Sequence, residues 1–121
     1  VIAETGPLSD YASYRRLLRM AGLNLREKKS GKYKGKNKIS KKGRARLRRI
    51  LYQVAMLFLV KPGGLYSKEY ARKKIDGRPT KIVMTAIMRK FLRAIFGIHR
   101  SDSPFMLERF NCCKSQLEQA A

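Results

Sequence analysis

The sequence predicts an all-α fold, a small helical domain interrupted by a long basic loop rich in lysine and glycine. Apolar residues recur at helical spacing in several stretches that glycine and proline separate. No stretch shows the period-two alternation of a half-buried strand. With 121 residues, of which 44% are hydrophobic, the chain is long enough for one domain with a core of its own.

The first predicted helix runs from about Tyr11 to Ala21, with Asp10 as its N-cap and Gly22 as its C-cap. Residues 1–6 are expected to be the end of an earlier helix or a connector. After Gly22, the segment from Lys28 to Gly43 is dominated by lysine and glycine. It keeps no helical period, and we therefore expect a flexible loop.

Three further helices are predicted after this loop. The first runs from about Arg44 to Val60, and its inward stripe consists of Leu47, Ile50, Leu51, Val54, Ala55 and Phe58. A shorter helix runs from about Leu65 to Ile75, and a long one from Pro79, at its first position, to about His99. Residues 1–110 are expected to form the domain, and residues 111–121 a C-terminal tail.

The charge of the chain indicates a nucleic-acid partner. The formal net charge is +21, and 13 of the 29 basic residues lie between Arg26 and Arg49, with Glu27 as the one acid in that interval. Such a density repels itself unless an anion neutralises it, and it predicts steep salt dependence of binding. The longest apolar run, Val54 to Val60, is far shorter than a membrane-spanning helix.

The residues offer little for self-contained catalysis. The eight acids are scattered, and none pair at the spacing of metal ligands, so no metal site is expected. His99 lies at the end of a helix, where a cation stabilises the helix dipole. The adjacent Cys112 and Cys113 are expected to be reduced thiols, because two thiols and one remote histidine do not make a zinc site.

Ser30 lies in the basic loop, before Gly31, and has two interpretations. Ser-Gly pairs commonly form turns, which the residue types alone favour. Alternatively, the serine hydroxyl attacks a DNA phosphate that neighbouring cations hold. The residues predicted to bind nucleic acid are Arg26, Lys28, Lys29, Lys32, Lys34, Lys41, Lys42, Arg44, Arg46, Arg48 and Arg49.

An ordered series of motifs carries a resemblance to a known family. The motifs are Ala21-Gly22-Leu23, Arg26, Ser30-Gly31, Ile39-Ser40-Lys41-Lys42-Gly43, Leu47-Arg48-Arg49-Ile50-Leu51-Tyr52, Tyr70, Pro79-Thr80-Lys81 and Ala86-Ile87-Met88-Arg89-Lys90. Together they resemble the C-terminal domain of the one-ten insertion-sequence transposases, the DEDD transposases related to Piv invertase, a family shared with insertion sequences 116 and 902. The resemblance covers roughly Ile2 to Phe110. One departure is Leu25, where many relatives have proline.

The resemblance implies that the active site is shared between two domains of a longer protein, of which this chain is expected to be a fragment. Members have a RuvC-like domain with four magnesium-binding acids and a helical domain with a helix-hairpin-helix-like start, whose serine is the proposed nucleophile. That serine corresponds to Ser30, and Mg is expected in the missing RuvC-like domain, with no cofactor in this fragment. The implied partners are DNA, a guide (bridge) RNA and further copies of the full-length protein, in the nucleoid-associated cytoplasm of a bacterium or archaeon.

Two other classes of function remain open at this point. A non-enzymatic RNA-binding protein of ribosomal type would share the composition, because lysine-glycine loops between short helices suit folded RNA. A basic membrane-surface protein agrees less well, since the apolar stripes are typical of a core. For the transposase interpretation, we expect the isolated fragment to bind nucleic acid with little sequence preference and not to cleave it.

Overall fold

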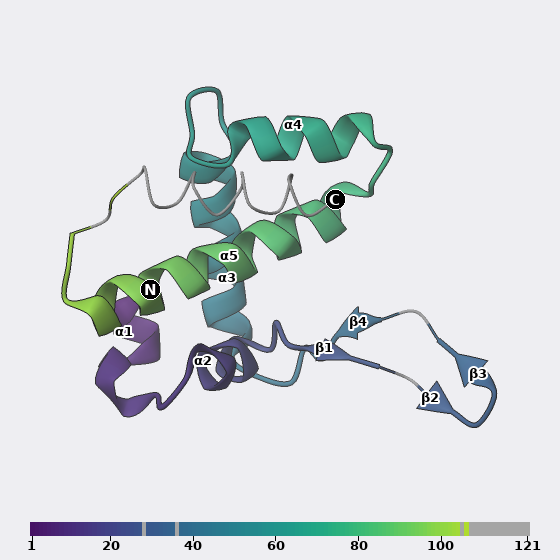
Figure 1. Cartoon of the computed structure of the whole chain (residues 1–121), viewed down its shortest axis with the longest axis horizontal. Helices are drawn as coiled ribbons and strands as arrows, with labels where there is room; N and C mark the ends of the chain where they lie inside the picture. Colours follow the sequence, from purple (N-terminus) through teal and green to yellow (C-terminus); the bar gives the residue numbers. More distant parts are fainter. Residues whose placement is uncertain (28, 36, 105, 107–121) are drawn as a thin grey trace.

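The computed structural model describes residues 1–27, 29–35, 37–104 and 106, and it consists of a helical body from which a β-ribbon projects (Figure 1). The predicted all-α class is confirmed, because the strands that the structure describes are two residues long and confined to this ribbon. The helices are α1 (Ile2–Thr5), the 3-10 turn η1 (Leu8–Asp10), α2 (Tyr14–Ala21), α3 (Ala45–Val54), the π-helical turn η2 (Ala55–Leu59), α4 (Ser67–Ile75) and α5 (Thr80–Ser101). The strands are β1 (Leu25–Arg26), β2 (Lys29–Ser30), β3 (Tyr33–Lys34) and β4 (Lys38–Ile39).

The start of α2 differs from the prediction, whereas its end agrees. Asp10 is not the N-cap, because it closes η1 and the following Tyr11 is extended. The extended Ser13 occupies the N-cap position instead, and α2 begins at Tyr14. Gly22 ends the helix in the left-handed region at φ 68°, as predicted, and its N–H bonds to the carbonyl oxygen of Arg19 at 2.9 Å.

The helix predicted from Arg44 to Val60 is present, but its last turn is π-helical. The Val60 N–H donates to the Ala55 carbonyl oxygen at 3.0 Å, five residues back. A π-turn takes up one more residue than an α-turn, so the next inward position passes from Phe58 to Leu59. Leu59 is accordingly 6% exposed and Phe58 is 63% exposed, and the prediction that Phe58 lies in the core was wrong.

A buried carboxylate joins the two C-terminal helices. Glu69, on α4, is 5% exposed, and its Oε1 lies 2.6 Å from the Nζ atoms of both Lys73, on α4, and Lys90, on α5. Burial raises the pKa of Glu69, but the hydrogen bonds and charges of the two lysines outweigh this effect, and the pKa lies below its usual value. The ion-pair cluster therefore favours the charged carboxylate and fixes α4 against α5.

The core forms where α5 contacts α2, α3 and α4, as Figure 1 shows for its crossing of α3. α4 begins at Ser67 and α5 at Thr80, each close to the predicted start. Pro79 occupies the N-cap position of α5 rather than the first helical position. The fully buried large side chains are Leu17, Leu23, Leu47, Leu51, Tyr66, Val83, Met84, Ile87 and Leu92.

Some predictions fall outside the part of the chain that the structure describes. The boundary between a domain at 1–110 and a tail at 111–121 lies there, as do Cys112 and Cys113. Lys28 also lies outside the described residues. They stay predictions from the sequence.

Candidate nucleic-acid interface

The segment expected to be a flexible loop forms most of an antiparallel ribbon, defined here as residues 25–39. β1 pairs with β4, with Leu25 opposite Ile39, and β2 pairs with β3, with Ser30 opposite Tyr33. The prediction of a loop without strands was wrong over these pairs. The strands are too short and too polar to show an alternating pattern, which is why the sequence did not reveal them.

Ser30 ends β2, immediately before the turn that reverses the ribbon. Gly31 provides this turn with its left-handed backbone at φ 56°, a conformation that glycine adopts without a steric penalty. The Ser-Gly pair therefore does form a turn, and Ser30 is exposed there. In Figure 1 the ribbon extends away from the helices, so this turn lies at the far end of a projecting arm.

The ribbon concentrates positive charge. Residues 25–39 contain seven basic residues and one acid, Glu27. The register places Arg26 directly opposite Lys38, and both are exposed. Like charges in directly opposed positions destabilise a strand pair, so an anion lying along the ribbon would relieve the repulsion.

Three arginines near the start of α3, namely Arg44, Arg46 and Arg48, contact other segments of the chain. Arg46 forms an ion pair with Glu4 of α1, at 3.0 Å between Nε and Oε1, and Arg44 Nη1 donates to the carbonyl oxygen of Glu4 at 2.6 Å. Arg48 Nη1 donates to the carbonyl oxygens of Ala21, at 3.1 Å, and Gly43, at 3.4 Å. The predicted nucleic-acid residues whose side chains are described as exposed are Arg26, Lys32, Lys41, Lys42, Arg44, Arg46 and Arg49.

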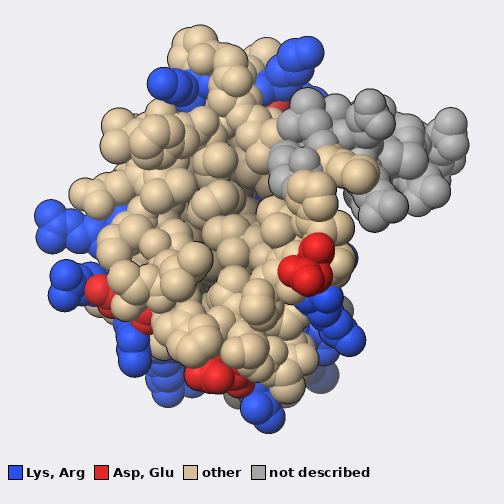
Figure 2. All heavy atoms as spheres, turned by 90° about the vertical axis from the view of Figure 1, so that its left-hand side faces the viewer, with Lys and Arg blue, Asp and Glu red and all other residues tan. Residues whose placement is uncertain are grey.

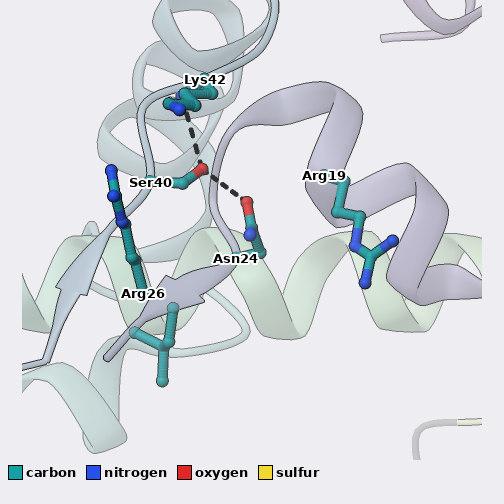
Figure 3. Close-up of a pocket in the computed structure, with 6 residues that line it drawn as sticks. Arg19, Asn24, Arg26, Ser40 and Lys42 are labelled. Atoms are coloured by element: carbon teal, nitrogen blue, oxygen red, sulfur yellow. Dashed lines mark hydrogen bonds between the residues drawn. The ribbon is translucent and has the colours of Figure 1, made fainter. Parts of the chain in front are cut away.

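A pocket lies at the root of the ribbon, and sequence reasoning missed it. It has a volume of about 440 Å³ and is lined by Arg19, Asn24, Leu25, Arg26, Ser40 and Lys42 (Figure 3), a set named here the ribbon-base pocket. Arg26 and Lys42 were predicted to bind nucleic acid, whereas Arg19, Asn24 and Ser40 were not. The motif Ile39-Ser40-Lys41-Lys42-Gly43 was the one signal in the sequence that pointed to this pocket. Nothing in the sequence indicated that Ser40 lies close to Arg19.

Two glycines allow the chain to close tightly beside this pocket. A Cβ atom at Gly43 would come within 2.6 Å of the Gly22 nitrogen and 2.8 Å of the Arg19 carbonyl oxygen, both backbone atoms. The Arg44 N–H donates to the Met20 carbonyl oxygen at 2.8 Å, and the Lys41 N–H to that of Gly22 at 3.0 Å. The segment that follows β4 is thus fixed against the C-terminus of α2.

Charge is unevenly distributed over the molecule. Figure 2 views the side opposite the ribbon, and most of that face carries neither lysine nor arginine, with blue side chains mainly at its edges. Among the described residues, no group of three or more histidine, cysteine, aspartate or glutamate side chains is placed to hold a metal ion. None of the helices in the described part is long and apolar enough to cross a membrane.

Comparison with known proteins identifies one family. Residues 1–71 match the family model described as "Transposase IS116/IS110/IS902 family". This match covers more than half of the 121 residues and includes α1, α2, the ribbon, α3 and every residue of the ribbon-base pocket. The chain matches no curated protein.

Proposed function

Because the chain belongs to the Transposase IS116/IS110/IS902 family, we propose that it is the part of a transposase that supplies a serine nucleophile, Ser30, for DNA strand cleavage and exchange. Transposases act on DNA, and a chain with a net charge of +21 is suited to bind it. The proposal goes beyond family membership in assigning the nucleophile, the guide RNA and the source of the metal.

The observation that carries this proposal is the position of Ser30. The Ser30 hydroxyl is exposed at the end of a basic ribbon that projects from the helices. A DNA backbone can contact a hydroxyl in this position, whereas it could not enter a deep, enclosed site. Its cationic surroundings favour both the bound phosphate and the negative charge that develops on it during attack. The resemblance described above independently relates Ser30 to the serine of the family.

The proposed step is a transfer of a phosphodiester linkage to the enzyme. Ser30 Oγ attacks phosphorus, a new P–O bond to the serine forms, and the bond between phosphorus and one deoxyribose oxygen breaks. The serine loses a proton as the new bond forms, and the departing oxygen takes one up to leave as a hydroxyl. Groups of the proposed RuvC-like domain, which is not part of this chain, take up the serine proton and supply the proton for the departing oxygen. No oxidant or reductant is required.

The described residues do not fit a role as metal ligands, since no three potential ligands gather among them. The resemblance leads us to place Mg in the proposed RuvC-like domain, and no step on this chain passes through it. A bridge RNA that pairs with donor and target DNA would choose the sites, because backbone contacts made by lysine and arginine carry no sequence information. In the complete protein, a homo-oligomer would bring the two halves of each active site together.

A covalent trapping assay tests the nucleophile. The complete transposase is incubated with Mg²⁺, guide RNA and labelled DNA, and denaturing electrophoresis then detects protein that carries DNA. We expect an adduct for the wild type and no adduct for Ser30→Ala. The control is Ser101→Ala, which removes an exposed serine hydroxyl at the end of α5, away from the ribbon, and should form the adduct. If the adduct persists in Ser30→Ala, Ser30 is not the nucleophile.

The same assay separates the proposal from its rival. A protein that binds nucleic acid tightly but forms no adduct in the wild type would support a non-enzymatic RNA-binding role. The 121-residue chain alone should bind DNA without cleaving it. Robust metal-independent cleavage by this chain would contradict the division of the active site.

A further inference from the structure

The ribbon-base pocket is a second polar site, separate from the Ser30 turn. Its residues come from three places in the sequence, namely the last turn of α2, the β1 segment and the segment after β4. Three of them are the cations Arg19, Arg26 and Lys42, and no aspartate or glutamate lines the pocket. Such a lining selects an anionic ligand.

Ser40 determines how the Asn24 side chain is oriented. The Ser40 hydroxyl lies 2.5 Å from Asn24 Oδ1, and the Lys42 N–H donates to the same hydroxyl oxygen at 3.3 Å (Figure 3). Since the hydroxyl oxygen accepts from Lys42, its own proton requires an acceptor, which is Asn24 Oδ1. The Asn24 Nδ2 group is then left as a donor, and it has no hydrogen-bond partner among the described residues.

The pocket is held in place by the backbone. The Ser40 N–H donates to the Asn24 carbonyl oxygen at 2.8 Å, which joins two of the three segments. Lys41 adopts a left-handed conformation at φ 53°, which a non-glycine residue rarely accepts unless its surroundings impose it. The Asn24 amide is thus held in place before any ligand arrives, which lowers the cost of ordering it on binding.

The cations of the pocket have no carboxylate partner in the described part of the chain, whereas several other lysines and arginines do. Arg46 pairs with Glu4, and Lys73 and Lys90 both pair with Glu69, whereas Arg19, Arg26 and Lys42 form no such pair. Because the pocket adjoins the basic ribbon, its natural anion is one group of a continuous polyanion rather than a small free ion.

We infer that the ribbon-base pocket binds a phosphodiester group of a nucleic-acid strand, with Arg19, Arg26 and Lys42 neutralising it and the Asn24 amide donating to it. This assignment rests on the proposed function, and it adds a fixed backbone contact from which the ribbon extends to Ser30. Asn24 and Arg19 are binding residues in this account, and Ser40 is a positioning residue that acts through Asn24.

Three variants of the 121-residue chain with the same charge change test the inference. Asn24→Asp keeps Oδ1 as the acceptor for Ser40 but replaces the donating amide with an anion, and Arg19→Gln removes a cation. Arg100→Gln, in the last turn of α5, is the matched control, since α5 ends on the side of the molecule opposite the ribbon (Figure 1). Fluorescence anisotropy at a series of salt concentrations measures binding to labelled DNA and, separately, to RNA.

We expect Asn24→Asp and Arg19→Gln to weaken binding about tenfold or more. We also expect each to reduce the slope of log K against log salt by about one, as for the loss of one phosphate contact. If the pocket variants lose affinity for DNA alone, for RNA alone or for both, the result identifies which nucleic acid supplies the phosphodiester. Circular dichroism in urea should show unchanged unfolding for Asn24→Asp.

The inference is overturned if both pocket variants bind as tightly as Arg100→Gln in both arms. That result, with tight binding by the wild type, would leave the proposed function standing. A wild type that binds no nucleic acid at all would instead contradict the proposed function itself.

Discussion

Replacing Gly43 with alanine should strongly destabilise the fold. The added Cβ would lie 2.6 Å from the Gly22 nitrogen and 2.8 Å from the Arg19 carbonyl oxygen, and closer still to the Met20 carbonyl oxygen. All three are backbone atoms, so no side chain can rotate away to make room. Overpacking of this kind costs about 1–3 kcal/mol, and we expect about 3 kcal/mol here because the three contacts coincide at the C-terminus of α2.

Urea unfolding followed by circular dichroism measures this effect. With a slope of about 1–3 kcal/mol/M, a loss of about 3 kcal/mol lowers the unfolding midpoint by about 1–3 M. Gly97→Ala is the matched control, since Gly97 lies within α5 and a Cβ there would meet no atom within 4 Å. It should stabilise the chain by about 0.5–1 kcal/mol through helix propensity. If Gly43→Ala unfolds at the wild-type midpoint, the close packing beside the ribbon-base pocket is wrong.

Two further predictions concern the helical body. Glu69→Gln should lower the free energy of unfolding by about 2 kcal/mol at pH 7. The pKa of Glu69 is lower in the folded protein than in the unfolded chain. The stability that the charged carboxylate contributes is therefore complete above the unfolded pKa of about 4.3, and it is lost as pH falls through the folded pKa. Urea titrations at pH 7 and pH 3 should therefore show a smaller difference between wild type and variant at pH 3, and an equal or larger one would contradict the assigned ion pairs. Leu59→Ala should cost about 2–4 kcal/mol and Phe58→Ala below about 1 kcal/mol, because the former is 6% exposed and the latter 63% exposed. The reverse order in thermal unfolding would exclude the π-helical turn.

The long helices were predictable from the sequence because burial imposes a period on many residues at once. The 22-residue α5 repeats its apolar positions over several turns, and Gly22 marks the end of α2 through its backbone freedom. The π-helical turn was not predictable in the same way. It depends on a local change of hydrogen-bond partners, seen at Val60, and an apolar run such as Ala55 to Val60 is consistent with either register.

The candidate site was predictable only in its chemistry. The density of lysine and arginine indicated a polyanionic partner, and the Ser30-Gly31 pair indicated a turn, which the structure contains. The ribbon was missed because its strands are only two residues long, which is too short for an alternating pattern to be recognised. The ribbon-base pocket was missed for a related reason, since the antiparallel pairing of β1 with β4 is what brings Asn24 beside Ser40.

Mass spectrometry that locates the covalent bond to DNA tests the role of Ser30 as the nucleophile. The trapped complex of the complete transposase is digested with nuclease and protease, and the peptide that retains a nucleotide is sequenced by fragmentation. We expect a nucleotide on the Ser30 hydroxyl. A nucleotide on Ser40 or on any other residue would contradict this role.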